Sequence, residues 1–241
     1  MKNIIIYGGT SLISIELIKK FNLETDTFFI VGRNKKKFNK VSQVLSNDIL
    51  CKINFYELDI LNITQNIDFI NKLETNSIDG VFFLIGETGN PEIEFSNYSE
   101  CLTNYNTNLI NPIIIINNLS MKLKNNSFLC VFTSMSGLRG RALRLFYCSA
   151  KAGLISYLSG LRQKLFKRNI QVLNVIAGYM STEKFNYKAN KFLINSPNEV
   201  ANKVANGIKK KKENIYTSNL WFFIAIVLKI LPEKIFKRLN F

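Results

Sequence analysis

The chain has 241 residues, which is long enough for one sizeable hydrophobic core. Hydrophobic residues make up 47% of it and charged residues 20%, as in globular proteins, and no uninterrupted apolar run is long enough to demand a bilayer. The first residues lack the long apolar region of a signal peptide, and the four cysteines lie far apart without CxxC spacing. We therefore expect one domain over residues 1–241, in a reducing, cytoplasmic setting and without a metal site.

The formal net charge of +15 could indicate an acidic partner, such as nucleic acid, a phosphorylated substrate or an anionic membrane. Lys, Asn and Ile are abundant throughout the chain, so the total charge by itself indicates little. The positive charge concentrates between Glu183 and Phe241, where twelve Lys and Arg residues stand against four acidic residues. This local excess is more informative than the total, and we predict no nucleic-acid partner.

Short apolar runs alternate with amphipathic stretches of helical length, a pattern typical of repeated β-α units. We predict seven strands, at 2–7, 27–32, 51–57, 79–85, 127–133, 170–176 and 213–217. We predict helices at 11–22, 34–45, 62–73, 98–122, 144–168 and 197–209, and an irregular or short helical segment near 182–192. The expected fold class is α/β: a single Rossmann-like, doubly wound parallel sheet of about seven strands with helices on both faces. Such a sheet binds its ligands beyond the carboxyl ends of its strands.

The first predicted strand is followed by the turn Gly8–Ser14 and then by an amphipathic helix. Glycines let a backbone pass close to a pyrophosphate at a helix N-terminus, and Thr10 and Ser11 can add hydroxyl donors. The match to a glycine fingerprint is incomplete, because Leu12 and Ser14 stand where further glycines are expected. Taken alone, the turn fits a phosphate-binding loop and a loop that binds nothing about equally well.

The second predicted strand ends at Gly32-Arg33, where NAD-binding folds usually carry an acidic residue for the ribose hydroxyls. A guanidinium at this place can bind a 2′-phosphate, so the sequence favours NADPH over NADH. The following lysines, 35–37, can equally be a solvated helix start. After the third strand, Asp59 could contact adenine or cap the next helix.

Tyr147 and Lys151 are spaced four residues apart and therefore share one face of a predicted helix. A ketone that receives a hydride needs a proton at its oxygen, and a phenol donates one more readily beside an ammonium group. Ser134, at the end of the preceding strand, can hold the substrate oxygen. A Tyr and a Lys at this spacing are common by chance, so the surrounding motifs decide the interpretation.

With these motifs in this order, the chain resembles the short-chain dehydrogenase/reductase family over nearly its whole length. The resemblance implies a catalytic group made of Asn108, Ser134, Tyr147 and Lys151. It also implies a cofactor site, which we expect at Gly8, Thr10, Ser11, Ile13, Arg33, Asp59, Gly86, Tyr147, Lys151, Gly178 and Thr182. Packing of the family through the helices at 98–122 and 144–168 further implies a homodimer or homotetramer.

The sequence departs from the family pattern at Leu12 and Ser14, at Ala177 in place of a proline, and at the segment 83–86, usually Asn-Asn-Ala-Gly. None of these changes removes a group that performs chemistry. They suggest a divergent branch similar to the decaprenylphosphoryl-2-keto-arabinose/ribose reductase type. We therefore expect an NADPH-dependent ketoreductase acting on a sugar or a polyprenyl-linked (lipid-linked) sugar in cell-surface glycan synthesis. The alternatives are a 3-oxoacyl or other lipid ketoreductase and a non-catalytic nucleotide-binding module.

Residues 218–241 form an apolar and basic carboxyl-terminal segment, in which the run 220–228 precedes several cations. The run is too short to span a membrane comfortably. Its aromatic start and cationic flank suit a helix lying in the interface of an anionic membrane. We therefore expect a peripheral membrane contact through residues 220–241, at the inner face of the membrane. The alternatives are a wall of the substrate pocket and a contact between subunits.

Overall fold

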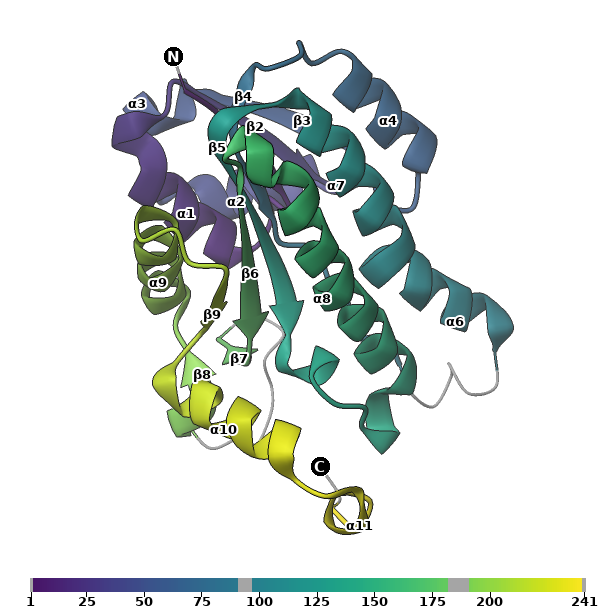
Figure 1. Cartoon of the computed structure of the whole chain (residues 1–241). Coiled ribbons are helices and arrows are strands. Elements are labelled where there is room, and N and C mark those ends of the chain that lie inside the picture. The colour runs from purple at the N-terminus through teal and green to yellow at the C-terminus, as the bar shows by residue number, and fades with distance from the viewer. Residues whose placement is uncertain (1, 91–96, 182–190, 240–241) are drawn as a thin grey trace.

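The computed structural model describes residues 2–90, 97–181 and 191–239, and its centre is a seven-stranded parallel sheet (Figure 1). The strands are β1 (Asn3–Tyr7), β2 (Thr27–Gly32), β3 (Ile53–Glu57), β4 (Ile78–Phe83), β5 (Leu123–Ser134), β6 (Gln171–Ala177) and β9 (Asn214–Tyr216). Their spatial order is β3-β2-β1-β4-β5-β6-β9, so the winding direction reverses between β1 and β4. The predicted doubly wound α/β fold is confirmed.

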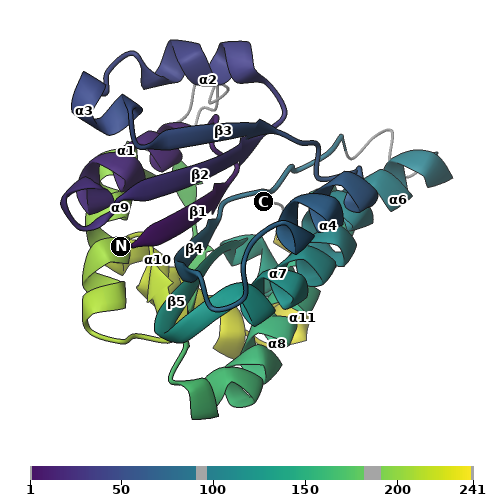
Figure 2. The same cartoon turned by 90° about the horizontal axis from the view of Figure 1, so that it is seen from above.

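Helices cover both faces of the sheet, as Figure 2 shows from above. One hydrophobic cluster packs the sheet against α1 (Leu12–Phe21), α2 (Lys35–Ser42) and α9 (Pro197–Lys209). The cluster on the other face joins it to α4 (Ile63–Asn71), α7 (Asn111–Lys122) and α8 (Leu145–Leu165). Because both faces are buried, the strands are nearly continuous apolar runs, and each fully buried aliphatic side chain contributes about 1.5–3 kcal/mol.

The helix that we predicted over 98–122 is interrupted. It consists of α6 (Tyr98–Tyr105), a π-helical segment over Asn106–Ile110, and α7. Asn108 lies inside the π-helical segment, is fully buried, and donates from Nδ2 to the carbonyl oxygen of Asn104 at 3.0 Å. Such bulges in helices often occur at functional sites. The spacing of apolar residues over 98–122 did not indicate this interruption.

Other elements differ from the prediction at their boundaries. Strand β5 begins at Leu123, four residues before the predicted start, and a short helix α3 (Asn47–Leu50) precedes β3. Two short strands, β7 (Tyr179–Met180) and β8 (Ile194–Asn195), pair in a small separate sheet. Of the segment near 182–192, residues 182–190 lie outside the described part of the chain, and Lys191–Leu193 form one 3-10 turn.

The chain ends with helix α10 (Asn219–Ile230) and the short helix α11 (Glu233–Phe236). Ser218 caps α10 by accepting a hydrogen bond from the amide of Trp221 at 3.2 Å. Both helices lie beyond the carboxyl ends of β5 and β6 (Figure 1). Among the described residues, no helix combines the length and the apolarity needed to cross a bilayer.

Candidate functional site

The turn after β1 has a backbone that only glycine accommodates easily. Gly8 has a φ of +89°, and the amides of Gly8 and Gly9 both donate to the carbonyl oxygen of Val31 at 3.0 Å. A Cβ atom on Gly9 would lie 2.1 Å from Cγ2 of Ile30. The turn therefore packs closely against β2 and leads directly into the N-terminus of α1, a geometry that suits a phosphate group.

Two serines complete this turn. The Ser11 hydroxyl caps α1 by accepting from the amide of Ser14 at 3.3 Å, and it donates to the carbonyl oxygen of Gly8 at 2.9 Å. Ser14 is fully buried, and its Oγ lies 2.6 Å from the carbonyl oxygens of both Gly9 and Ser11. The departure from glycine at Ser14 is therefore accommodated, because its side chain folds back onto the turn rather than toward a ligand.

The other predicted residues of the turn, Thr10 and Ile13, take different places. Thr10 is half-buried beside Gly32, whose added Cβ atom would lie 3.1 Å from Cγ2 of Thr10. The side chain of Ile13 is buried in the core, so this residue can face a ligand only through its backbone. The first amides of an α-helix lack intrahelical acceptors, and Ile13 lies in that first turn.

Beyond β2 and β4, Arg33 and Glu87 approach each other across the end of β1. Nη2 of Arg33 lies 3.5 Å from Oε2 of Glu87, and both side chains are about half exposed. No sequence motif singled out Glu87. Asp59 accepts a hydrogen bond from the amide of Leu61 at 2.9 Å, and Asn62 takes the N-cap position of α4. Asp59 thus stabilises the turn that leads into α4. This role resembles the predicted helix cap, although the cap itself is Asn62.

Tyr147 and Lys151 lie one turn apart on α8, as their spacing predicted. Nζ of Lys151 is 5.7 Å from the centre of the Tyr147 ring and donates to the carbonyl oxygen of Ile85 at 3.2 Å. Lys151 is almost completely buried, and this burial lowers the pKa of its ammonium from 10.5 to about 8. The group can therefore gain or lose its proton near physiological pH.

The hydroxyl groups of Tyr147 and Ser134 meet at the carboxyl end of β5. Burial raises the pKa of the Tyr147 phenol, while its hydrogen bond with Ser134 and the positive charges of Arg144 and Arg141 oppose that rise. Ser134 also accepts from the amide of Ser136 at 3.1 Å. The phenol is thus kept protonated at neutral pH, beside a second hydroxyl group.

Asn108 and Gly86 connect this pair to the end of β4. Oδ1 of Asn108 accepts from the amide of Glu87 at 3.0 Å, and Nδ2 donates to the carbonyl oxygen of Glu87 at 2.7 Å. A Cβ atom on Gly86 would lie 2.8 Å from Nζ of Lys151 and 3.5 Å from Oδ1 of Asn108. Gly86 therefore lies close to both Asn108 and Lys151, and Lys151 in turn lies one helical turn from Tyr147.

Gly178, which follows β6, lies directly against α10. Its amide donates to Oγ1 of Thr217 at 3.1 Å, and a Cβ atom added to it would lie 2.0 Å from the indole ring of Trp221. No sequence motif indicated that Thr217 and Trp221 contact Gly178, although Trp221 is the one tryptophan of the chain. Thr182, predicted for the same region, lies outside the described residues.

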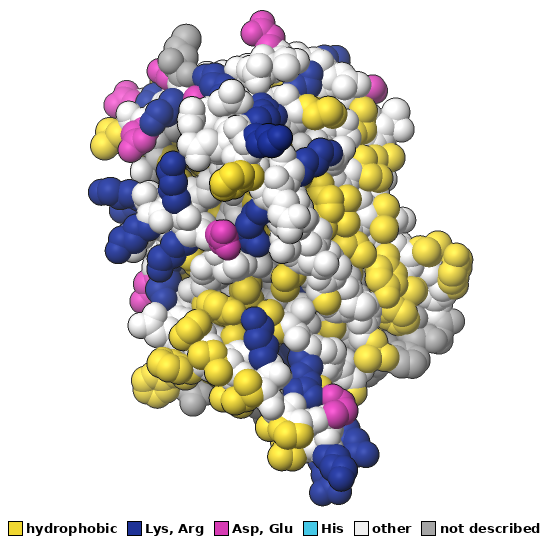
Figure 3. Space-filling model, viewed as in Figure 1, with side chains coloured by type: hydrophobic (Ala, Val, Ile, Leu, Met, Phe, Trp, Pro, Cys, Tyr) yellow, Lys and Arg dark blue, Asp and Glu magenta, His cyan; other side chains and the backbone are white. Residues whose placement is uncertain are grey.

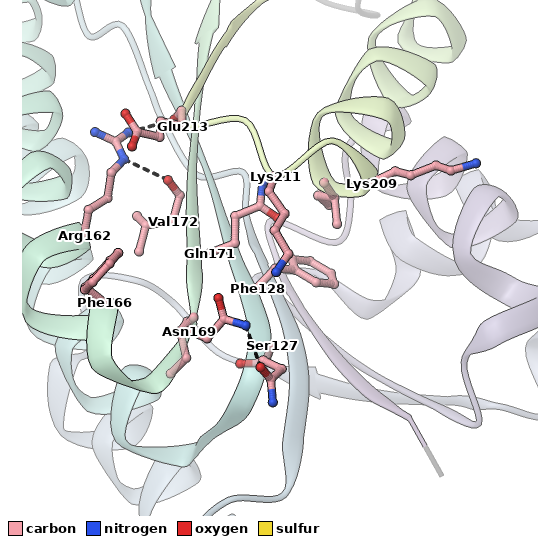
Figure 4. A pocket seen from close by; sticks show the side chains of 13 residues that line it. Ser127, Phe128, Arg162, Phe166, Asn169, Gln171, Val172, Lys209, Lys211 and Glu213 are labelled. Atoms are coloured by element: carbon pink, nitrogen blue, oxygen red, sulfur yellow. Dashed lines mark hydrogen bonds between the residues drawn. The ribbon is translucent and has the colours of Figure 1, made fainter.

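A cavity of about 280 Å³ lies at the opposite edge of the sheet, around Phe128 and Gln171 near the starts of β5 and β6 (Figure 4). Arg162 at its wall donates to the carbonyl oxygens of Val172 at 2.9 Å and Glu213 at 2.8 Å. None of the residues predicted for catalysis or cofactor binding lines this cavity. It is separate from the site formed by Tyr147 and its neighbours.

Similarity to known proteins extends over most of the chain. The protein named ketoacyl reductase HetN from Nostoc sp. is 30% identical over 156 residues, which are 58% of this chain and 54% of that protein. The chain thus spans about half the length of HetN. The 3-oxoacyl-[acyl-carrier-protein] reductase FabG of Aquifex aeolicus is 24% identical, with 83% of this chain and 87% of FabG covered. An uncharacterized oxidoreductase of Mycobacterium tuberculosis, Rv2073c, is 21% identical over 98% of the chain and 96% of its own length.

Solved structures have the same fold. A short chain dehydrogenase from Burkholderia cenocepacia in complex with NADP superposes with a TM-score of 0.81 at 16% identity, covering 99% of this chain and 98% of that one. BdcA in complex with NADPH gives a TM-score of 0.75 at 17% identity, covering 90% and 93%. The family model for short chain dehydrogenases matches residues 2–192. The chain belongs to the short chain dehydrogenase family.

Proposed function

We propose that this protein is an NADPH-dependent ketoreductase, which reduces a carbonyl group to a hydroxyl group. The observation that carries the proposal is the contact of the Tyr147 and Ser134 hydroxyls, with the buried Lys151 one helical turn away. The whole chain, residues 1–241, acts as one domain, and residues 218–241 form its carboxyl-terminal segment.

The residues around the sheet edge fit a phosphorylated nicotinamide cofactor, which when bound supplies a hydride. The narrow turn at Gly8 and Gly9 would hold the pyrophosphate at the N-terminus of α1. Arg33 would hold the 2′-phosphate. Gly86, where an added Cβ atom would lie 2.8 Å from Nζ of Lys151, would border the nicotinamide ribose, and Gly178 at the end of β6 would border the nicotinamide. Proteins of the same fold crystallised with NADPH or NADP give this assignment independent support.

In the proposed reaction, the Ser134 hydroxyl donates to the substrate carbonyl oxygen and holds it beside Tyr147. The substrate carbon accepts the hydride, and the phenol gives its proton to the oxygen, so that a C–H bond and an O–H bond replace the C=O π bond. The Lys151 ammonium favours this transfer, because its charge stabilises the phenolate that remains. Asn108 acts as a positioning residue, because it fixes Glu87 and thereby the chain next to Lys151.

The proposed substrate is a keto-sugar, in particular a polyprenyl-linked one used in cell-surface glycan synthesis. Its support is the sequence resemblance to the decaprenylphosphoryl-2-keto-ribose reductase branch and an apolar, basic carboxyl-terminal segment. A 3-oxoacyl thioester is the second candidate, because two relatives carry the names ketoacyl reductase and 3-oxoacyl reductase. A module that only binds nucleotide would not need a complete catalytic group. The presence of Asn108, Ser134, Tyr147 and Lys151 together therefore argues against this alternative.

The proposed enzyme is cytoplasmic and touches the inner face of the membrane through residues 220–241. Exposed apolar side chains of α10, among them Phe223 and Ile230, support the membrane contact. A homodimer or homotetramer would form through the helices at 98–122 and 144–168, which are α6, α7 and α8. Exposed apolar residues such as Ile114 and Leu145 on these helices are consistent with a subunit contact.

The test combines cofactor binding with turnover. We expect saturable NADPH binding that is much tighter than NADH binding, and NADPH oxidation with one member of a panel of keto-sugar nucleotides, polyprenyl-phosphoryl keto-sugars and 3-oxoacyl thioesters. Tyr147→Phe should abolish turnover and leave NADPH binding nearly intact. Tyr157→Phe, elsewhere on α8 with its hydroxyl 3.5 Å from the carbonyl oxygen of Ile113, is the matched control and should retain turnover. Retained turnover in Tyr147→Phe would remove the phenol as the proton donor.

A further inference from the structure

Helix α10 carries apolar side chains around most of its circumference, but only one of its sides packs against the rest of the protein. Between Leu220 and Ile230, Lys229 is the one charged residue. Its inner side consists of four residues at helical spacing that pack near the carboxyl end of the sheet: Trp221, Ile224, Ala225 and Leu228. They contact Met135 and Ile176, the neighbours of Ser134 and Ala177 on the central strands. The inner side of α10 is thus a wall beside the proposed active site.

The outer side of α10 repeats the same spacing with exposed residues. Phe223, Ile226, Val227 and Ile230 stand at i, i+3, i+4 and i+7, and their exposed fractions run from 41% at Ile226 to 72% at Ile230. Figure 3 shows apolar side chains gathered over α10 at the lower edge of the molecule. A continuous apolar face of this kind on a helix normally meets another apolar phase.

Cations border this apolar face. Lys229, Lys234, Lys237 and Arg238 are all exposed, and Figure 3 shows the basic side chains gathered below the apolar area. Glu233 is the one acidic residue described between 219 and 239, and its carboxylate is 2.6 Å from Nη2 of Arg139. The uncompensated charge around the apolar face is therefore positive. This combination matches an anionic lipid surface, which offers both an apolar layer and negative headgroups.

A second copy of the chain is a poorer occupant. Two copies that met symmetrically through this face would place the same basic borders close together, and Glu233, which already pairs with Arg139, is the one acidic residue described there between 219 and 239. The exposed cations of the two copies, Lys229, Lys234, Lys237 and Arg238, would then repel each other. The negative headgroups of an anionic membrane would instead attract these cations.

Arg139 joins this surface to the catalytic strand. It follows Ser134 by five residues, and its guanidinium donates to the carbonyl oxygens of Leu228, at 2.8 Å, and Leu231 at the end of α10. The guanidinium also lies 4.0 Å from the centre of the Phe236 ring. One side chain thus holds both carboxyl-terminal helices to the loop that connects Ser134 to Tyr147. The orientation of α10 is therefore fixed relative to the active site.

We propose that the outer face of α10, together with the cations of α11, docks on an anionic lipid bilayer, and that Arg139 holds this docking surface in register with the active site. The proposal deepens the membrane contact stated above and rests on it. Because the inner side of α10 borders the site, docking would place the carboxyl edge of the sheet next to the headgroups. A keto group carried on a lipid headgroup could then be reduced without the lipid leaving the bilayer.

The test uses the full chain in co-sedimentation with vesicles of phosphatidylcholine alone or mixed with phosphatidylglycerol. We expect binding to the mixed vesicles, weakened by salt, and little binding to the neutral ones. Phe223→Ser/Val227→Ser and Lys234→Gln/Lys237→Gln/Arg238→Gln should each bind the anionic vesicles at least ten-fold more weakly. The matched charge control is Lys20→Gln/Lys40→Gln/Lys72→Gln, on exposed lysines far from α10, and it should bind much more tightly than the α11 variant.

The fluorescence of Trp221 checks that these variants keep their fold. Trp221 is the one tryptophan of the chain and lies on the inner side of α10. Its emission should therefore not change in the Phe223→Ser/Val227→Ser variant or in the α11 variant. Arg139→Gln should shift this emission to the red, because it releases the carbonyl groups at the end of α10. An unshifted emission in Arg139→Gln would overturn the role given to Arg139.

Vesicle binding and turnover can be lost independently of each other. Tyr147→Phe should bind anionic vesicles like the wild type even though it does not turn over. The docking proposal would be overturned if the wild type, the Phe223→Ser/Val227→Ser variant and the Lys234→Gln/Lys237→Gln/Arg238→Gln variant all bound anionic vesicles equally well. A concentration-dependent dimer that Phe223→Ser/Val227→Ser abolishes, without vesicle binding by the wild type, would also overturn it and assign the face to a second copy.

Discussion

Nζ of Lys151 lies 5.7 Å from the centre of the Tyr147 ring, and the two groups have opposite responses to the same burial. Burial lowers the pKa of the Lys151 ammonium to about 8 and raises the pKa of the Tyr147 phenol. Tyr147 therefore stays protonated over the whole range in which Lys151 loses its charge. The protonation of Lys151, rather than that of Tyr147, should then set the alkaline limit of the proposed reduction.

Reduction should decline as the pH rises through about 8. The ratio kcat/KM reports the groups of the free enzyme, so its alkaline arm should follow the pKa of Lys151, about 8. The measurement is kcat/KM for NADPH-dependent reduction between about pH 6 and about pH 10. Lys151→Met should be much slower and lack this alkaline arm. A wild-type profile that stays flat through pH 8 would contradict the role given to the ammonium charge.

Lys151→Met should also stabilise the fold at neutral pH. The folded pKa of about 8 lies below the usual value of 10.5, so the unfolded chain binds more protons between these values. The cost of the buried charge is fully present below about pH 8 and disappears as the pH rises toward 10.5. Its removal should raise the free energy of unfolding by about 1–3 kcal/mol at pH 7, because the lost hydrogen bond to Ile85 offsets part of the gain.

Urea denaturation of the wild type and Lys151→Met at about pH 7 and about pH 10 measures this difference. The stability advantage of the variant should be largest at the lower pH and shrink at the higher one. A variant less stable than the wild type at pH 7 would mean that the contacts of the lysine stem outweigh the cost of its charge.

Much of this site follows from local sequence signals. Tyr147 and Lys151 share a face because helical periodicity puts residues four apart on one side, and Ser134 ends a strand whose apolar run is visible in the sequence. The strands themselves were predicted to within a few residues, except for the early start of β5 at Leu123. Buried parallel strands are easy to recognise because both of their faces are apolar.

The missed residues act through long-range contacts instead. Glu87 meets Arg33 across 54 residues, and Arg139 reaches Glu233 across 94 residues. Each partner lies in a loop or at a helix end, where no periodicity shows which residues will meet. The π-helical segment around Asn108 was missed for the same reason, because its hydrogen bonds to Glu87 come from another strand end.

Gly86→Ala should impair the site without unfolding the protein. The added Cβ atom would lie 2.8 Å from Nζ of Lys151, so the lysine end must move away from the carbonyl oxygen of Ile85. We expect turnover to fall by about ten-fold to about a hundred-fold, since misplacement by about 1 Å has effects of this size. The loss should appear in steady-state kinetics, with a small change in the free energy of unfolding.

Gly160→Ala is the matched control for this substitution. Gly160 is exposed in the middle of α8, and a Cβ atom there would meet nothing within 4 Å. Because alanine favours the helix, the variant should be more stable by about 0.5–1 kcal/mol and keep its turnover. If Gly86→Ala retained full turnover, the space beside Lys151 would not be a requirement of the site.

Arg33 and Glu87 should control the choice between NADPH and NADH in opposite directions. Arg33→Ala removes the cation proposed for the 2′-phosphate and should weaken NADPH binding by about ten-fold to about a hundred-fold, with little effect on NADH. Glu87→Gln removes a carboxylate that lies 3.5 Å from the same guanidinium. The ion pair is half exposed and contributes at most about 1 kcal/mol, so its removal should tighten NADPH binding by no more than about five-fold.

Fluorescence titrations of both cofactors at low and high salt measure these effects, and the gain in Glu87→Gln should shrink as salt screens the carboxylate. Equal losses for NADPH and NADH in Arg33→Ala would mean that the guanidinium supports the fold of the site rather than the 2′-phosphate.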